Sequence, residues 1–328
     1  MSTAPAFNGD ILRLEGVRKH YPIQRGFLQR TAGWVRAVDD VSLGIPAGQT
    51  LGLVGESGCG KTTLARMILK LLPSDSGRIL FKGVDIAPLS DSEMRPLRRE
   101  IQIVFQDPYG SLNPRMTVYQ ALAEGLRAHG IRDRGAARGR IEELLALVGL
   151  SPEAAERYPH EFSGGQRQRI GIARALSVEP SLVVCDEPVS ALDVSIQAQI
   201  LNLLKDLQDR LGLTYLFISH DLNVVGYLCH HVAVMYQGRI VEYAAADELF
   251  ENPLHPYTHI LLAAAPELES GHRPMDTGST EAPEPVEPPG ACRFRPKCPE
   301  ADERCDLFAG ELIAAGPEHY VRCWKGRF

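Results

Sequence analysis

GESGCGKTT, residues 55–63, carries the strongest structural signal in this chain. A short apolar run, residues 51–54, precedes it, and a stretch with helical periodicity, residues 61–72, follows it. Glycines let a backbone adopt positive φ and approach phosphate oxygens closely, so that successive N–H groups point inward in front of a helix N-terminus. The pattern therefore predicts a phosphate-binding loop that consists of Gly55, Glu56, Ser57, Gly58, Cys59, Gly60, Lys61, Thr62 and Thr63.

Two side chains of this loop have the chemistry that a nucleoside triphosphate requires. Lys61 can place a positive charge against the β- and γ-phosphates, and Thr62 can present its hydroxyl to Mg²⁺. Cys59 occupies a variable position of the pattern, and we interpret it as a small filler rather than as a nucleophile. The loop thus predicts a site for ATP or a similar nucleotide together with Mg²⁺.

A second apolar run, residues 182–185, ends in two carboxylates, Asp186 and Glu187. A carboxylate at the end of a buried strand can hold Mg²⁺ through its water shell, and we assign this role to Asp186. Glu187 can polarise the water that attacks a γ-phosphate. Together with the phosphate loop, the pair predicts hydrolysis of the bound nucleotide.

A third motif, SGGQ, precedes another helical pattern. A serine at this position is a good helix N-cap, and two glycines after it leave the helix N-terminus open to an anion. The motif therefore predicts a second phosphate site in the same chain. Its residues are Ser163, Gly164, Gly165 and Gln166.

The first 265 residues alternate between short apolar runs and helical patterns, as in an α/β domain. The runs that predict strands are residues 41–45, 51–54, 101–105, 182–185, 215–218, 232–236 and 239–243. Gln237-Gly238 predicts a hairpin turn between the last two, and Gly212 predicts the end of a helix over 192–211. Residues 117–176 show helical periods without a convincing strand, which predicts a helical insertion.

In this order and at these distances, the three motifs resemble the nucleotide-binding subunits of ABC transporters. The resemblance implies a P-loop NTPase core of the ABC type, with an antiparallel β subdomain and a helical subdomain at about 110–176. It also implies that two such chains meet head to tail, each ATP lying between one phosphate loop and the partner's SGGQ. Phe162 stands where leucine is commonest before SGGQ, a small departure since both are apolar.

The same resemblance assigns four further residues. Tyr21 matches the aromatic residue that stacks on adenine, and Gln106 matches the Q-loop glutamine, which contacts the Mg²⁺ or the attacking water. Asp193 belongs to the D-loop, residues 190–193, and acts with SGGQ on the partner's nucleotide. His220 matches the switch histidine, which senses the γ-phosphate.

Longer strings place the chain within one branch of this family. Residues 19–23, 36–42, 105–115 and 252–258 resemble the ATP-binding subunits of bacterial oligopeptide and dipeptide importers, including their nickel- and glutathione-transporting relatives. The insertion at residues 24–35 resembles the second of the two ATPase subunits, which implies a heterodimer. The implied partners are a second ATPase subunit, two transmembrane permease subunits and, indirectly, an extracytoplasmic solute-binding protein, at the cytoplasmic face of the bacterial inner membrane. The transported solute stays open.

The end of the chain has a different composition. Residues 266–291 are rich in Pro, acidic and small residues and predict a linker, which separates a body (1–265) from a short tail (292–328). The tail contains four cysteines with the spacing C-x5-C-x6-C-x17-C: Cys292, Cys298, Cys305 and Cys323. Four thiolates can hold zinc or an iron–sulfur cluster. The wide spacing and the family resemblance favour a [4Fe–4S] cluster, with zinc and no metal as alternatives.

Composition excludes several classes. The chain has 328 residues, 44% hydrophobic and 23% charged, so it is neither disordered throughout nor a disulfide scaffold. The formal net charge of −6 speaks against bulk nucleic acid as a partner, and no apolar run approaches the roughly 18–20 residues of a membrane span. Two other functions are alternatives: a soluble ABC-type ATPase that works without a membrane, and a metal-tail regulator with an inactive ATP site.

Overall fold

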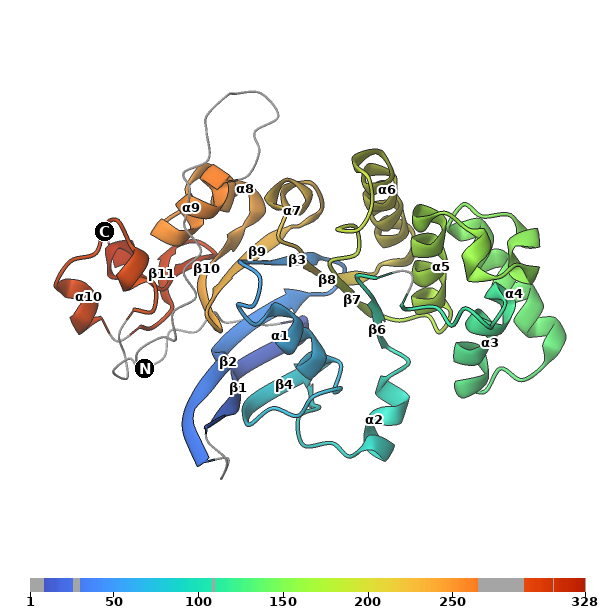
Figure 1. Ribbon diagram of the computed structural model, residues 1–328, viewed down its shortest axis with the longest axis horizontal. Helices are drawn as coiled ribbons and strands as arrows, with labels where there is room; N and C mark the ends of the chain where they lie inside the picture. Colours follow the sequence, from blue (N-terminus) through green and yellow to red (C-terminus); the bar gives the residue numbers. More distant parts are fainter. Residues whose placement is uncertain (1–8, 26–29, 108–109, 265–291, 309, 328) are drawn as a thin grey trace. The chain divides into compact units, whose positions relative to one another are not determined.

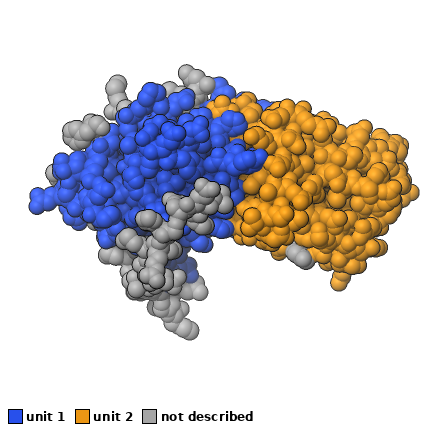
Figure 2. Space-filling model, turned by 90° about the horizontal axis from the view of Figure 1, so that it is seen from above, with its two compact units in different colours: residues 1–45, 51–87, 219–328 blue, residues 46–50, 88–218 orange. Residues whose placement is uncertain are grey.

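The computed structural model describes residues 9–25, 30–107, 110–264, 292–308 and 310–327 (Figure 1). These residues form two compact units, which Figure 2 shows in different colours. Unit 1 comprises residues 1–45, 51–87 and 219–328, and unit 2 comprises residues 46–50 and 88–218. Within the described ranges, no helix is both long enough and apolar enough to cross a membrane. The predicted linker, residues 266–291, lies outside the described residues.

Unit 1 contains a four-stranded sheet in the order β2-β1-β4-β5. Its strands are β1 (Asp10–Arg25), β2 (Arg30–Pro46), β4 (Ser76–Phe81) and β5 (Val84–Asp85). β1 pairs antiparallel with β4, with Leu12 opposite Phe81. The alternating run that predicted a strand over 41–45 lies in β2, and its apolar side chains are fully buried. This is the antiparallel β subdomain that the family resemblance implied.

Five further strands of unit 1 lie in the order β11-β12-β10-β9-β3. They are β3 (Thr50–Val54), β9 (His231–Tyr236), β10 (Arg239–Ala245), β11 (Ile313–Gly316) and β12 (His319–Val321). β3 and β9 are parallel, and the other neighbours are antiparallel. The hairpin predicted at Gln237-Gly238 is confirmed: both residues have positive φ, 42° and 82°, which a type I′ turn requires. The tail thus adds two strands to the sheet beyond β10.

The helices of unit 1 follow its strands along the chain. They are α1 (Lys61–Ile68), α7 (Leu222–Leu228), α8 (Ala246–Glu251), α9 (Pro256–Ala264) and α10 (Arg304–Leu307), with short 3₁₀ helices at Arg295–Lys297 and Trp324–Arg327. α1 is shorter than the predicted stretch 61–72. Lys70 adopts φ 55°, and the N–H of Leu71 bonds back to the carbonyl of Arg66, a Schellman-type end.

Unit 2 combines a parallel sheet with a helical segment. Its strands lie in the order β8-β7-β6 and are β6 (Ile101–Val104), β7 (Leu182–Asp186) and β8 (Thr214–Ile218). β7 and β8 are apolar and buried on both faces, as the continuous runs predicted. The helices are α2 (Asp91–Leu97), α3 (Val118–Ala128), α4 (Arg134–Leu147), α5 (Gly164–Leu176) and α6 (Val194–Leu211), with 3₁₀ helices at Pro152–Glu156 and Pro159–Glu161.

The helical insertion predicted over 117–176 is confirmed. All of these residues are described, and they form α3, α4, α5 and the two 3₁₀ helices without a strand. The predicted helix over 192–211 is also confirmed as α6. Asp193 caps its start by accepting the N–H of Ile196 at 2.9 Å, and Gly212 ends it with φ 66°. Local chemistry at both ends therefore determines where this helix begins and ends.

Candidate functional site

The predicted phosphate loop connects β3 to α1 in unit 1, and its glycines are required by close backbone approach. Gly55 has φ 149°, and a Cβ there would lie 2.1 Å from the carbonyl oxygen of Met235. Gly60 has φ 114°, and a Cβ there would lie 2.0 Å from the carbonyl oxygen of Ala37. These contacts are too short for any side chain. The loop is therefore pressed against β9 and β2, which fixes its path in front of α1.

The loop lysine is buried and points back into the loop. The ammonium of Lys61, which is 5% exposed, donates to the carbonyl oxygens of Gly55 at 2.6 Å and Glu56 at 2.9 Å. Thr62, the predicted Mg²⁺ ligand, is exposed at the start of α1. Cys59 is buried, and burial raises the pKa of its thiol, which agrees with its interpretation as a filler. One positive charge therefore lies inside the turn of the loop, where a polyphosphate binds.

Two hydrogen bonds attach the backbone of the loop to other parts of unit 1. The N–H of Glu56 donates to the hydroxyl of Tyr257 in α9 at 3.0 Å. The N–H of Gly238, in the turn between β9 and β10, donates to the carbonyl of Cys59 at 2.8 Å. Sequence reasoning did not find Tyr257, although the string 252–258 that contains it was recognised as typical of one branch of the family. The string gave no indication that its tyrosine reaches the loop.

The two predicted carboxylates lie at the end of β7 in unit 2. Asp186 is the last residue of the strand, and Glu187 follows it with φ 47°, a conformation that is uncommon for a residue with a side chain. The N–H of Glu187 donates to the carbonyl of Ile218 at 3.0 Å, which anchors this turn to β8. Strained backbone of this kind is concentrated at functional sites.

The structure brings Gln106 to Glu187. Its side-chain amide donates to Glu187 Oε2 at 2.9 Å and lies 3.4 Å from the hydroxyl of Ser190. A residue that the resemblance placed near Mg²⁺ or the attacking water thus holds one oxygen of the predicted catalytic carboxylate. Both polar side chains lie at the carboxyl ends of parallel strands, the usual place for ligand contacts in such sheets.

The SGGQ motif forms the start of α5, as predicted. Ser163 Oγ accepts the N–H of Gln166 at 3.3 Å, and the side chain of Gln166 accepts the N–H of Ser163 at 3.0 Å, so the two form a capping box. Gly165 packs against Ile196, where a Cβ would lie 2.4 Å from a methyl group. Ile196 is the residue whose N–H Asp193 caps, so SGGQ and the D-loop aspartate lie together within unit 2.

Two predicted nucleotide contacts lie on the surface of unit 1. Tyr21 is 39% exposed on β1, with the ammonium of Lys19 5.7 Å from its ring centroid. His220 is exposed just after β8. Both side chains are therefore accessible to a ligand from solvent.

The four tail cysteines are free thiols that line one cavity of unit 1, together with His255, Phe294 and neighbouring residues. Burial raises the pKa of Cys292 and of Cys323. Among the residues that the structure describes, no group of three or more His, Cys, Asp or Glu side chains is arranged to hold a metal ion. The prediction of a [4Fe–4S] cluster is therefore not supported, although the four thiols line one cavity.

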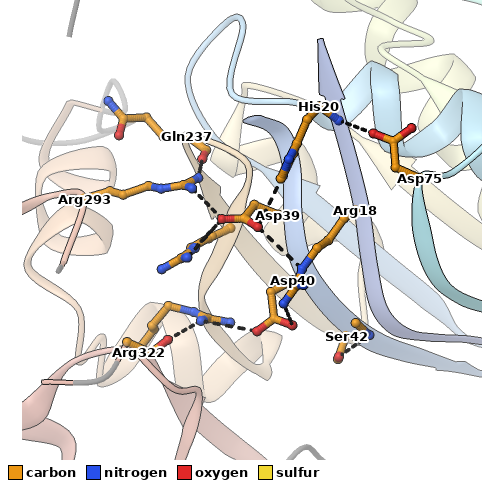
Figure 3. Close-up of polar contacts among 12 residues, drawn as sticks. Arg18, His20, Asp39, Asp40, Ser42, Asp75, Gln237, Arg293 and Arg322 are labelled. Atoms are coloured by element: carbon orange, nitrogen blue, oxygen red, sulfur yellow. Dashed lines mark hydrogen bonds and ion pairs between the residues drawn. The ribbon is translucent and has the colours of Figure 1, made fainter. Parts of the chain in front are cut away.

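Strand pairing and a buried ion pair hold the tail in this structure. β12 pairs with β10, and His319 of β12 contacts Glu242 of β10 at 2.8 Å. Arg293 reaches Asp39 in β2 at 2.5 Å (Figure 3). No pattern in the sequence indicated that the tail adds strands to the sheet edge.

Comparisons with known proteins agree with these features. The family model described as "ABC transporter" matches residues 38–190, and the model described as "Oligopeptide/dipeptide transporter, C-terminal region" matches residues 241–305. The second match includes Tyr257 and three of the four tail cysteines.

Curated relatives match along nearly the whole chain. The protein y4tS of Sinorhizobium fredii, named a probable peptide ABC transporter ATP-binding protein, is 51% identical, with 95% of this chain and 89% of the relative covered. The oligopeptide transport ATP-binding protein AppF of Bacillus subtilis is 50% identical, with 95% and 96% covered.

Solved structures show the same fold. The ATP-binding cassette MJ0796, in a dimeric post-hydrolysis state bound to ADP and Pi, matches with a TM-score of 0.63 and 29% identity, covering 72% of this chain and 98% of that one. The cassette cbiO1 from Clostridium perfringens matches with a TM-score of 0.64 and 30% identity, covering 75% and 92%. The chain therefore belongs to the family of ATP-binding subunits of ABC transporters, in the branch that carries the oligopeptide/dipeptide transporter C-terminal region.

Proposed function

We propose that this chain hydrolyses ATP to drive a bacterial importer of dipeptides, oligopeptides or related small solutes. The observation that carries the proposal is the combination of a phosphate loop with a buried Lys61 and a Glu187 held by Gln106. The relatives that match 95% of the chain are named for peptide transport, which supports the solute class. A soluble ATPase without a transporter is disfavoured, because the C-terminal region typical of the transporters is present.

Within this proposal each motif has one task. The loop amides and Lys61 bind the phosphates, and Thr62 and Asp186 hold Mg²⁺, whose charge is neutralised by hard oxygen ligands. Glu187 accepts a proton from the attacking water, and Gln106 keeps its carboxylate oriented. His220 contacts the γ-phosphate, and Tyr21 stacks on the adenine ring.

The proposed assembly is a head-to-tail dimer of ATPase subunits on the cytoplasmic side of the membrane. Ser163, Gly164, Gly165, Gln166 and Asp193 then act on the partner's nucleotide, at the open N-terminus of α5. ATP closes the dimer because its γ-phosphate contacts the phosphate loop of one subunit and the SGGQ motif of the other. Hydrolysis reopens the dimer because it removes this shared contact. The dimeric form of MJ0796 with ADP and Pi supports this arrangement. The partner is a second, non-identical ATPase subunit, and two permease subunits and a solute-binding protein complete the importer.

The test removes the proposed general base. Glu187→Gln should lower kcat for ATP hydrolysis about 10²–10⁴-fold and leave ATP affinity unchanged, because the phosphate contacts are intact. Glu179→Gln is the matched control, since Glu179 also has positive φ and is exposed in unit 2, where it pairs with Arg140. Normal turnover in Glu187→Gln, with the control also normal, would remove Glu187 from the catalytic role.

The proposal also includes a metal cluster in the tail, with Cys292, Cys298, Cys305 and Cys323 as its ligands. Cysteine thiolates are soft ligands suited to iron–sulfur clusters or zinc, and the four thiols line one cavity. Iron, sulfide and zinc should be measured in anaerobically purified protein, with Cys298→Ser as control. About four iron and four sulfide per chain, lost in the variant, would support a [4Fe–4S] cluster. Zinc or no metal would end the cluster hypothesis and leave the ATPase function untouched.

A further inference from the structure

Two elements of unit 1 that are remote in sequence form hydrogen bonds with the backbone of the phosphate loop. One is the turn between β9 and β10, whose Gly238 donates to the carbonyl of Cys59. The other is Tyr257, whose hydroxyl accepts the N–H of Glu56. Tyr257 is 1% exposed, so its hydroxyl position depends on the side chains that pack around its ring.

Arg293 and Phe294, two consecutive tail residues, contact these two elements between them. Arg293 donates to the carbonyl oxygen of Gln237, inside the β9–β10 turn, and to Asp39 Oδ2 at 2.5 Å (Figure 3). The ring of Phe294 lies 5.4 Å from that of Tyr257 and 5.2 Å from that of Tyr236, the last residue before the turn. Phe294 is 3% exposed, so it fills the space behind both tyrosines.

The contacts of Arg293 connect the turn to β2. Asp39 receives Arg239 as well as Arg293, and its own N–H donates to the carbonyl of Gly238 at 2.8 Å. Arg293 therefore bridges two groups that flank the same turn. Gln237 and Gly238 both have positive φ, a conformation that only glycine adopts without strain. The hydrogen bond from Arg293 to the carbonyl of Gln237 therefore stabilises this turn.

From these contacts we propose that Arg293 and Phe294 are positioning residues for the phosphate loop, so that the C-terminal tail sets the affinity of the chain for ATP. Phe294 orients the hydroxyl of Tyr257 toward Glu56, and Arg293 holds the turn that supports Cys59. The inference rests on the proposed binding of phosphates by residues 55–63.

The test measures ATP affinity and turnover in the full chain. Phe294→Ala and Arg293→Ala should raise the Kd and KM for ATP about three- to tenfold, the equivalent of one hydrogen bond in the loop, with kcat within about twofold of wild type. Phe294→Leu should restore part of the affinity, because it refills most of the apolar volume. Arg295→Ala is the matched control: its side chain is 43% exposed and pairs with Asp306 at the surface.

A second variant keeps the test valid if either tail variant fails to fold. Tyr257→Phe removes only the hydroxyl that accepts the Glu56 N–H and should raise KM to a similar degree. Lys61→Ala tests the proposed binding of phosphates by the loop independently of the role of the tail. Loss of ATP binding in Lys61→Ala, with unchanged affinity in Phe294→Ala, Arg293→Ala and Tyr257→Phe, would overturn the role of the tail and leave the proposed function standing. Unchanged binding in Lys61→Ala would overturn both.

Discussion

Replacing Glu242 by Gln is expected to destabilise unit 1 strongly, although the two side chains have the same shape. Glu242 lies in β10 and is fully buried. Its Oε1 accepts the N–H of Leu254 at 2.7 Å and contacts His319 Nε2 at 2.8 Å, while its Oε2 accepts the N–H of His255 at 2.9 Å. One carboxylate therefore joins β10, the segment that precedes α9, and strand β12 of the tail.

The magnitude follows from counting acceptors. A glutamine offers one oxygen and one NH₂ group, so one of the two backbone N–H groups loses its acceptor in a buried site, at a cost of about 1–3 kcal/mol. The charge-assisted bond with His319 is lost as well, which costs about 1.5–3 kcal/mol. The free energy of unfolding should fall by about 3–5 kcal/mol, the range found when one member of a buried pair is removed.

The pH dependence of the same pair has a definite sign. Burial raises the pKa of Glu242, but the hydrogen bond from His319 and the backbone N–H groups outweigh it and lower the pKa below 4.5. Burial lowers the pKa of His319, but its bond to Glu242 outweighs it and raises the pKa above 6.5. The stabilisation by Glu242 is present above pH 4.5 and lost as the pH falls through its lowered pKa; that by His319 is present below pH 6.5 and lost as the pH rises through its raised pKa.

Urea unfolding followed by circular dichroism, at pH 6 and pH 8.5, measures both effects. The difference between wild type and Glu242→Gln should be largest at pH 6 and smaller at pH 8.5. His319→Gln is the control and should cost less, because Glu242 keeps both backbone donors. A loss below about 1 kcal/mol at pH 6, or a loss equal at the two pH values, would refute this account of the pair.

Two further predictions concern the surroundings of the phosphate loop. Gly60→Ala should abolish ATP binding measured by isothermal titration calorimetry, because its Cβ would lie 2.0 Å from the carbonyl oxygen of Ala37 at a φ of 114°; retained affinity would mean that the loop can move away from β2. Asp39→Asn should lower the free energy of unfolding by about 3 kcal/mol, because it leaves Arg239 and Arg293 facing a neutral group. Burial raises the pKa of Asp39, but the two arginines outweigh this effect and lower the pKa below 3.8. The wild type should therefore keep this stabilisation above pH 3.8 and lose it as the pH falls through the lowered pKa, whereas the variant should show no such acid limb in a denaturation series.

The parts that could be predicted from the sequence are those determined by neighbouring residues. Ser163 caps α5 through a group three residues away, and Gly212 ends α6 through its own φ, so both were identified from local chemistry. The glycines of residues 55–63 were predicted to allow close approach of the backbone to phosphate oxygens. The structure adds that Gly55 and Gly60 are pressed against the protein's own carbonyl groups.

The parts that could not be predicted depend on contacts between distant residues. Tyr257 reaches Glu56 across 201 positions, and Arg293 reaches Asp39 across 254. No periodicity or spacing encodes such pairs, because they exist only once the sheet has brought the tail beside β10. The cysteine spacing has the same weakness: it shows that four thiols are available, but their directions depend on the side chains that pack around the cavity, among them Phe294, Phe308 and Trp324.

The phosphate loop and the tail residues that stabilise it are synthesised at different times. The loop is complete when residue 63 has been synthesised, whereas Phe294 follows 231 residues later (294 minus 63). At about 5–20 residues per second, a ribosome needs roughly 10–50 s for that interval. During this time the nascent chain carries the loop without Arg293 and Phe294, and β12 is made later still. A chain released before residue 292 therefore has Gly238 and Tyr257 but lacks Arg293 and Phe294, the tail residues that contact the β9–β10 turn and Tyr257.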